Sequence, residues 1–407
     1  MDTVRFGVVG LGAMGSFHVS YMDKLEGATL GAVCDVDNER VERLAKKYEA
    51  TPSPLGQPRG AVSRFNHFRQ MIDSGAVDAV LIATPHPQHP EVALAAFEKG
   101  LHVLCEKPVA VSVKEARRMN DAYAEAARRR PGLKFGLMYQ MRTVPLYRKL
   151  RELVVEGELG EVTRVTWLIT DWFRTWTYYA SGGWRATWKG EGGGVLINQC
   201  PHNLDLIQWV TGGLIPSRVM AVGFVGKTHP IEVEDEISAI LEYPNGAIGH
   251  FVTTTGEAPG TNRLEVCGDR GKVVAENGKL TFTRTRKGVR EIRETSKEMF
   301  ATPETWTIDV PLAAAPSQPH ELVTQNFVHA VLKDEPLMSP GVEGVRGLEI
   351  GNAMLMAGLT RKPVELPLDA DAYEQFLQEM HRRYGGKKTL QTQAVSPADM
   401  GASFAKP

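Results

Sequence analysis

The chain has 407 residues, 43% of them hydrophobic and 23% charged, and its formal net charge is -1 at pH 7. So balanced a charge gives no positive field that would attract DNA, RNA or an anionic membrane surface, and we expect none of these partners. The length exceeds the roughly 100–200 residues of a typical domain, so we expect two domains.

The first third of the chain alternates short apolar runs with helical patterns. Continuous apolar runs are typical of strands that helices bury on both faces. Their alternation with helices predicts a doubly wound α/β fold around a parallel sheet, with one proline-rich loop over residues 51–62. The predicted elements are strand 5–9, helix 14–25, strand 29–34, helix 38–48, strand 79–83, helix 90–99, strand 103–105, helix 113–129 and strand 134–139.

The chain changes in character after a linking helix predicted over residues 144–156. Strand-like runs now follow one another with turn signals such as Pro244-Asn245-Gly246 between them, which predicts a large, mostly antiparallel sheet. The polar tail, residues 386–407, is expected to extend away from the core. The predicted elements are strands 161–170, 219–224, 236–243, 247–255 and 262–266, and helices 201–210, 320–333 and 342–360.

Cysteine usage and the N-terminus favour a cytoplasmic protein. The four cysteines include no closely spaced pair, so neither a disulfide framework nor a cysteine-based zinc site is expected. The first residues lack the basic segment and apolar core of a signal peptide, and no apolar run approaches the ~20 residues that cross a bilayer.

A glycine-rich segment, Gly10-Leu-Gly12-Ala-Met-Gly15, follows the first predicted strand and opens the first helix. In this setting the glycines allow a tight turn, a close backbone approach to a pyrophosphate, and close helix–strand packing. Asp35 ends the second strand, where a carboxylate accepts hydrogen bonds from ribose hydroxyls. The alternative is an ordinary turn with Asp35 as a helix cap. We predict an NAD site that includes Gly10, Gly12, Ala13, Met14, Gly15 and Asp35.

Later motifs resemble the glucose–fructose oxidoreductase / inositol dehydrogenase (Gfo/Idh/MocA) family. The triplet Glu106-Lys107-Pro108 follows a predicted buried strand. The other matching segments lie between residues 4 and 367, and so cover nearly the whole chain. They are Ala83-Thr84-Pro85 with His89, Gly192-Gly193-Gly194 with Asn198, His202 and Asp205, and the late segments Asn326-Phe327, Gly347-Leu348-Glu349 and Val364-Glu365-Leu366-Pro367.

The resemblance implies an NAD-binding Rossmann domain over residues 1–142 and a substrate-binding and oligomerisation α/β domain over 143–385. It implies a homodimer or homotetramer, with the large sheet as the dimer face. It also implies a catalytic lysine, Lys107, because a lysine beside the nicotinamide can stabilise a developing alkoxide. The cofactor site then extends to Thr84, Pro85, His86, His89, Glu106 and Lys107.

His202 is the second catalytic candidate, because oxidation of an alcohol releases a proton that a histidine can accept near neutral pH. The alternative is a structural histidine in the first turn of a helix, close to Asp205. Family members often have Asp where this chain has Asn198. An amide cannot act as a base, but it can orient a hydroxyl with one donor and one acceptor.

His86 and His89 form a His-x-x-His pair, which could indicate a metal site. No carboxylate or cysteine lies nearby in the sequence to complete a ligand set, so we expect no metal. His89 is instead expected to cap a helix that begins at Pro90, beside the cofactor.

Residues 171–189 contain four of the seven tryptophans, and Tyr178, Tyr179 and three basic residues lie among them. Flat aromatic faces suit the C–H face of a sugar ring, and basic groups could hold an anionic substituent. We expect about half of these aromatics to be structural. The predicted substrate-binding residues are Tyr139, Arg174, Trp176, Trp184, Arg185, Asn198 and His202.

The primary hypothesis is an oxidoreductase that transfers a hydride between NAD and a secondary hydroxyl of a sugar or cyclic polyol. The alternative is a redox-neutral glycosidase that uses NAD for transient oxidation, followed by elimination, hydration and reduction. A third, non-catalytic NAD-binding regulator is disfavoured by the presence of both Lys107 and His202.

Overall fold

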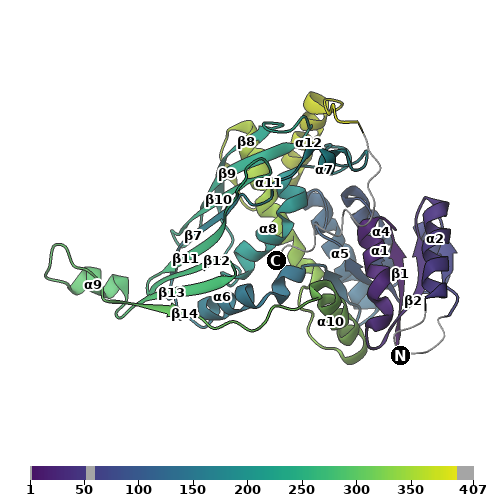
Figure 1. The fold of residues 1–407 in the computed structure, drawn as a ribbon, viewed down its shortest axis with the longest axis horizontal. Helices are drawn as coiled ribbons and strands as arrows, with labels where there is room; N and C mark the ends of the chain where they lie inside the picture. Colours follow the sequence, from purple (N-terminus) through teal and green to yellow (C-terminus); the bar gives the residue numbers. More distant parts are fainter. Residues whose placement is uncertain (1, 52–59, 392–407) are drawn as a thin grey trace. The chain divides into compact units, whose positions relative to one another are not determined.

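The computed structural model describes residues 2–51 and 60–391, which group into two compact units (Figure 1). The first unit runs to Gln140 and also includes Gln318–Val345. The second comprises Met141–Ser317 and residues 346–391. The sequence-based division at residue 142 did not anticipate that Gln318–Val345 groups with the first unit. Most of the predicted loop at 51–62 lies outside the described residues.

A six-stranded sheet forms the centre of the first unit, and every strand pair in it is parallel. Its order, β3-β2-β1-β4-β5-β6, is that of a doubly wound Rossmann sheet, which confirms the predicted fold class. The reversal between β1 and β4 brings the carboxyl ends of these strands to the place where such sheets bind ligands. The strands are β1 (Val4–Val9), β2 (Ala28–Cys34), β3 (Ser63–Phe65), β4 (Ala79–Ile82), β5 (His102–Cys105) and β6 (Phe135–Leu137).

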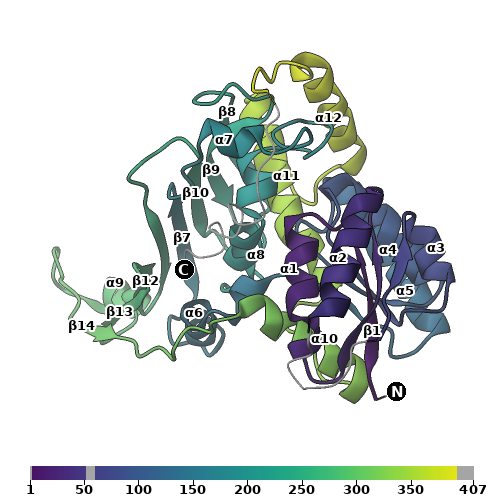
Figure 2. The ribbon, with the colours of Figure 1, turned by 45° about the vertical axis from the view of Figure 1, so that its right-hand side comes forward.

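Helices pack on this sheet, and their ends are fixed by local capping. Ser112 accepts a hydrogen bond from the backbone N–H of Glu115, as expected at a helix N-terminus. Helix α10 lies beside β1 (Figure 2). Its Phe327 packs against Phe6 of β1, with ring centroids 6.1 Å apart. The helices are α1 (Ala13–Tyr21), α2 (Asn38–Ala50), α3 (Phe68–Asp73), α4 (His89–Glu98), α5 (Val113–Arg129) and α10 (Pro319–Lys333), with 3-10 turns η1 (Met22–Lys24), η2 (His86–Gln88) and η5 (Gly341–Glu343).

The second unit is built on a nine-stranded sheet of order β14-β13-β12-β11-β7-β10-β9-β8-β15. All of its described pairs are antiparallel except β10 with β7, which confirms the predicted, mostly antiparallel sheet. The strands are β7 (Val162–Ile169), β8 (Arg218–Val225), β9 (Glu234–Glu242), β10 (Ile248–Thr254), β11 (Asn262–Gly268), β12 (Gly271–Glu276), β13 (Lys279–Thr285), β14 (Thr305–Asp309) and β15 (Val364–Glu365).

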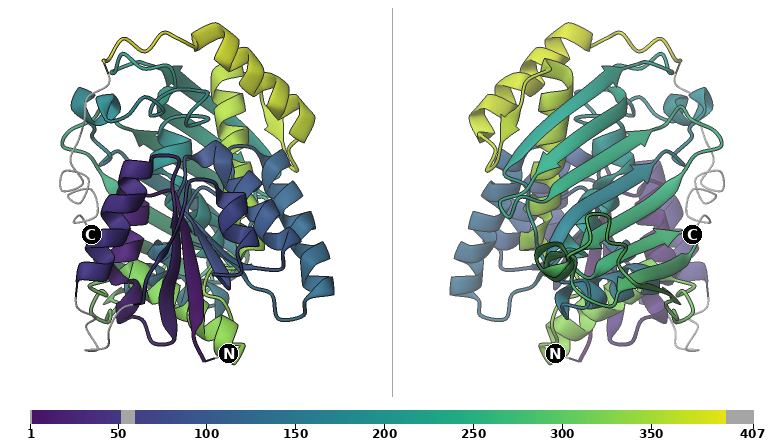
Figure 3. Two further views of the ribbon diagram at one scale, coloured as in Figure 1. Left: turned by 90° about the vertical axis from the view of Figure 1, so that its right-hand side faces the viewer. Right: turned by 90° about the vertical axis from the view of Figure 1, so that its left-hand side faces the viewer.

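One face of this sheet carries helices, as in the contact of α11 with Ile237 of β9. The opposite face, seen at the right of Figure 3, is left largely uncovered by residues 2–51 and 60–391. Strand β9 alternates buried Ile237, Ala239 and Leu241 with exposed Ser238 and Ile240, as expected for a sheet with one solvated face. The remaining elements are η3 (Gln140–Thr143), α6 (Pro145–Val155), α7 (Trp176–Ala180), η4 (Val195–Gln199), α8 (Pro201–Trp209), α9 (Val289–Thr295), α11 (Gly344–Thr360) and α12 (Ala370–Tyr384).

The prediction for the tail was wrong for the part of it that the structure describes, residues 386–391. The ammonium of Lys388 donates to the backbone carbonyl of Arg185 at 2.8 Å, and the N–H of Gly386 donates to Glu232 at 2.8 Å. This segment is therefore tied to the loop at 182–185, while residues 392–407 lie outside the described part of the chain. Within the described ranges, no helix is long and apolar enough to cross a membrane.

Candidate functional site

The glycine turn after β1 has the geometry that the sequence predicts. Gly10 has a φ of +88°, and its N–H donates to the carbonyl of Cys34 at 2.9 Å. A Cβ on Gly15 would lie 1.8 Å from the carbonyl oxygen of Gly10, so only glycine allows α1 to start here. A Cβ on Gly12 would meet nothing within 4 Å, so this backbone can be approached closely. An open glycine turn at a helix N-terminus fits a pyrophosphate.

Asp35 braces this turn rather than capping a helix. Its Oδ2 accepts the N–H of Leu11 at 2.7 Å, and its Oδ1 accepts the N–H of Asp37 at 2.9 Å. The cap of α2 is Asp37, which accepts from Glu39 and Arg40, so the alternative of Asp35 as a helix cap is wrong. Each oxygen of Asp35 keeps further acceptor capacity, as a contact with ribose hydroxyls requires.

His89 connects two loops of the predicted cofactor site. Its ring lies in α4, and its nitrogens are 2.8 Å from the carbonyl of Pro108 and 2.9 Å from that of Thr84. A cap would accept backbone N–H groups, so the predicted capping role was wrong. His86 is also buried, one helical turn earlier, and Pro85 precedes it. The described ranges hold no group of three or more His, Cys, Asp or Glu side chains arranged for a metal.

The turn after β5 carries Glu106 and Lys107, and the Lys107–Pro108 peptide is cis. Glu106 is buried, and its Oε1 lies 2.7 Å from Nε2 of His18 on α1. Burial alone raises the pKa of Glu106, but the hydrogen bond from His18 and nearby positive charges lower it to about 2. His18 was not predicted as a site residue, because its position in the helix after the glycine motif gives no indication of a contact with Glu106.

In the second unit, Asn198 and His202 flank the junction of two helical segments. Asn198 lies in the π-helical segment η4, and His202 lies in the first turn of α8, which begins at Pro201 as expected. Asp205 is bound by Arg142 through two hydrogen bonds of 2.8 and 2.6 Å. Because both of these side chains are 1% exposed, the carboxylate of Asp205 is committed to a buried ion pair.

Asn198 belongs to a closed set of polar contacts, here named the polar ring. Its amide donates to Glu191, which the sequence analysis missed and which is 1% exposed. Glu191 lies 3.7 Å from Nη1 of Arg185, and this nitrogen donates to the hydroxyl of Tyr178 at 2.7 Å. Gln199, the neighbour of Asn198, also donates to Tyr178, at 3.1 Å. The ring therefore holds Asn198, a predicted catalytic and substrate residue, together with Arg185, a second predicted substrate residue.

Glu234 of β9 binds the backbone at the end of the triple glycine and the start of η4. It accepts the N–H groups of Gly194 at 2.7 Å and of Leu196 at 3.0 Å. A Cβ on Gly194 would lie 1.8 Å from the carbonyl oxygen of Glu234, so this glycine is needed for close packing of η4 on β9. Burial raises the pKa of Glu234 to about 8, although the two backbone hydrogen bonds oppose the shift.

The aromatic segment divides into buried and accessible side chains. Trp188 is buried, and its indole N–H donates to the carbonyl of Glu232 at 2.5 Å. Tyr179 is also buried and donates to Thr255 at 2.8 Å. Trp176 is 59% exposed, whereas Trp184 is half-buried beneath the guanidinium of Arg185.

Two other predicted substrate residues differ in their surroundings. Arg174 is half-buried and lies over the rings of Trp172 and Tyr178, with its guanidinium carbon 5.2 and 4.9 Å from the two centroids. Tyr139 belongs to the first unit, directly after β6, and is buried there. The second unit therefore groups Arg174 and Arg185 around Tyr178, while Tyr139 belongs to the first unit.

Two family profiles match the chain. Residues 4–130 match the profile described as "Oxidoreductase family, NAD-binding Rossmann fold", and residues 147–274 match "GFO/IDH/MocA C-terminal domain". The first unit is thus an NAD-binding Rossmann domain, and its open glycine turn and Asp35 fit that cofactor.

Known proteins match over most of their length. Trans-1,2-dihydrobenzene-1,2-diol dehydrogenase of Bos taurus is 30% identical over 270 residues, which are 66% of this chain and 72% of that protein. 1,5-Anhydro-D-fructose reductase of Ensifer adhaerens is 26% identical over 341 residues, which are 83% of this chain and 92% of that protein. The WlbA dehydrogenase from Bordetella pertussis, solved with NADH and UDP-GlcNAcA, has the same fold with a TM-score of 0.72 and 24% identity, covering 90% of this chain and 100% of that chain.

Proposed function

Because this chain belongs to the Gfo/Idh/MocA family of NAD-binding sugar and polyol oxidoreductases, we propose that it oxidises a secondary hydroxyl of a sugar or cyclic polyol. NAD, when bound, would accept the hydride. The observation that carries the proposal is the Glu106-Lys107 turn at the carboxyl end of β5, in a domain whose glycine turn fits NAD. The named relatives support it, because they are a diol dehydrogenase and a sugar reductase.

In this proposal Lys107 and His202 have different roles in the oxidation of the hydroxyl. The Lys107 ammonium hydrogen-bonds the reacting oxygen and stabilises negative charge as it develops there. His202 accepts the hydroxyl proton, since a neutral imidazole is the side-chain base best matched to pH 7. Tyr139 remains a candidate substrate residue from the first unit.

Asn198 orients a substrate hydroxyl in this proposal, and Glu191 fixes how it does so. The amide N–H of Asn198 donates to Glu191, which sets the direction in which its carbonyl oxygen points. Arg185 is paired with Glu191 and covered by the rings of Tyr178 and Trp184, so it serves to hold the aromatic segment. Trp176 and Arg174 are the candidates for direct contact with the sugar.

Kinetics with excess NAD and a panel of free polyols, sugars and aryl glycosides tests the proposal. We expect NADH to accumulate with a free polyol or sugar, one NADH per molecule oxidised. Lys107→Ala should lower kcat by about 10²–10⁴-fold while the Kd of NAD stays within about twofold. Release of the aglycone without net NADH, with exchange of the sugar C2 proton into D₂O, would contradict net oxidation and establish the glycosidase alternative.

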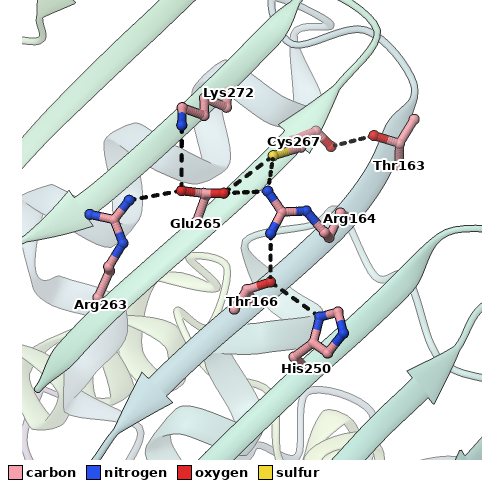
Figure 4. Close-up of polar contacts among 8 residues, drawn as sticks. All are labelled: Thr163, Arg164, Thr166, His250, Arg263, Glu265, Cys267 and Lys272. Carbon is pink, nitrogen blue, oxygen red and sulfur yellow. Dashed lines mark hydrogen bonds and ion pairs between the residues drawn. The ribbon is translucent and has the colours of Figure 1, made fainter.

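We further propose that the uncovered face of the nine-stranded sheet joins two copies of this chain. Ile240 of β9 is 42% exposed and pairs with His250 of β10, so both side chains lie on this face. Beside them, Glu265 contacts Arg164, Arg263 and Lys272, which gives the face both apolar groups and charges of both signs (Figure 4). A face of this composition suits a self-complementary interface.

Light scattering after size exclusion tests this interface. A dimer or tetramer is expected for the wild type, and Ile240→Asp should lower the mass by halving the assembly. Val36→Asp is the matched control, because Val36 is 92% exposed in the first unit. An unchanged mass in Ile240→Asp would show that another surface assembles the protein.

A further inference from the structure

A buried chain of hydrogen bonds ends at the Glu106-Lys107 turn, and no role proposed above uses it. His18 of α1 is fully buried, with Nε2 at 2.7 Å from Glu106 and Nδ1 against the hydroxyl of Tyr21. The Tyr21 oxygen lies 2.9 Å from Oγ1 of Thr324 on α10. Three elements far apart in the sequence thus converge on the residue that precedes the proposed catalytic lysine.

The direction of the hydrogen bond between His18 and Glu106 follows from the atoms involved. An ionised carboxylate only accepts, so Nε2 of His18 carries a hydrogen and donates it to Oε1. The other carboxylate oxygen accepts the backbone N–H of Lys107 at 3.2 Å. Both oxygens of Glu106 are therefore anchored, and its negative charge is fixed one residue from Lys107.

We propose that His18 and Glu106 form a positioning pair, which aims the turn that carries Lys107 and holds the lysine amine in its charged form. The reason is that a fixed opposite charge nearby favours the charged state of an amine. The proposal rests on the role of Lys107 given above, but it concerns the charge of the lysine, which can be measured without turnover.

The other titratable groups around the pair do not compete with it. Burial lowers the pKa of His320 on α10 to about 4 and also lowers the pKa of His89, so both are neutral near pH 7. Burial raises the pKa of the Tyr21 phenol, which is neutral too. The charge that remains beside the pair is that of Lys107, which acts on Glu106, while Glu321 of α10 acts on Tyr21.

A titration of Lys107 by NMR tests the pair. Lysines of the full-length, NAD-bound protein are labelled with ¹³C-methyl groups, and the Lys107 signal is the one that Lys107→Arg removes. Glu106→Gln should lower the titration midpoint of Lys107 by about 1–3 units, because the nearby negative charge is lost. His18→Phe removes the hydrogen-bond donor but keeps the Glu106 carboxylate. The titration midpoint of Lys107 in this variant should therefore equal that of the wild type or exceed it.

His102→Gln is the matched control. His102 is another buried histidine, at the start of β5, and its ring accepts the N–H of Lys134 at 3.0 Å. An unchanged midpoint in Glu106→Gln would overturn the proposal, as would an equal fall in Glu106→Gln, His18→Phe and His102→Gln, since general loosening would then explain it. If the wild type oxidises no polyol, the proposed function fails, but the comparison of midpoints still decides whether the Glu106 carboxylate holds Lys107 in its charged form.

Discussion

Replacing Asn198 by aspartate should destabilise this protein. The amide of Asn198 donates to Glu191, which is buried, so Asn198→Asp would set two carboxylates against each other. Losing a hydrogen bond to a charged group costs about 1.5–3 kcal/mol. With the added repulsion between the two carboxylates, we expect the free energy of unfolding to fall by about 3 kcal/mol at pH 8. For a domain of this size this corresponds to a fall in Tm of roughly 6–12 °C.

The loss of stability in Asn198→Asp should be larger at high pH than at low pH, because the two carboxylates face each other. Two facing carboxylates raise the pKa of one of them above its unfolded value, so the penalty is full above that raised pKa and shrinks as the pH falls through it. Thermal melts of Asn198→Asp from pH 5 to pH 9 measure this. The double variant Glu191→Gln with Asn198→Asp restores one donor facing one acceptor and should recover most of the Tm. A single variant as stable as the wild type at pH 8, or a double variant no better than the single, would refute the contact.

Three further outcomes follow from the structure. Glu234 has its folded pKa raised from 4.5 to about 8, so its contribution to stability is full below pH 4.5 and is lost as the pH rises to 8; the Tm of the wild type should fall between these two pH values, and Glu234→Gln should flatten that fall. Lys388→Met frees the loop at 182–185 and should raise the KM for the polyol but not for NAD, whereas Lys387→Met, an exposed neighbour, should change neither. Wild-type kinetics should favour NAD over NADP, because a 2′-phosphate would face the Asp35 carboxylate, and Asp35→Ser should narrow that preference.

The sequence predicted the parts of the fold that depend on burial. Strands β1, β2, β4 and β5 are covered on both faces, so their apolar runs are continuous and easily recognised. Strand β14 was missed, although Trp306 and Ile308 alternate with polar residues along it; all five of its residues are exposed, and only two of them are large and apolar, so the pattern is short. Helix α12 was missed too, although its buried side chains, Tyr373, Phe376 and Met380, recur at helical spacing.

Site residues that belong to a short sequence motif could be predicted, whereas those that depend on contacts between distant loops could not. The glycine turn and the Glu106-Lys107 triplet are local, and the structure gives both the expected setting. Glu191 reaches Asn198 only because the chain between them folds back through the triple glycine. Lys388 meets Arg185 across 203 residues, a contact that no spacing in the sequence encodes.

The polar ring also bears on the choice between net oxidation and glycoside cleavage. The carboxylate of Asp205 is committed to Arg142, and that of Glu191 reaches Asn198, whose amide cannot relay a proton at neutral pH. Tyr179 donates to Thr255 in a buried contact, and burial raises the pKa of its phenol, which removes it as a base. His202 is then the one residue among these candidates suited to accept a proton. A single acceptor meets the need of alcohol oxidation, whereas elimination also requires a proton to be taken from the neighbouring carbon. With Asp205, Glu191 and Tyr179 engaged in these contacts, elimination would have to use Tyr139 or Tyr178 as its second base, and this added requirement is the reason that net oxidation is the function proposed above.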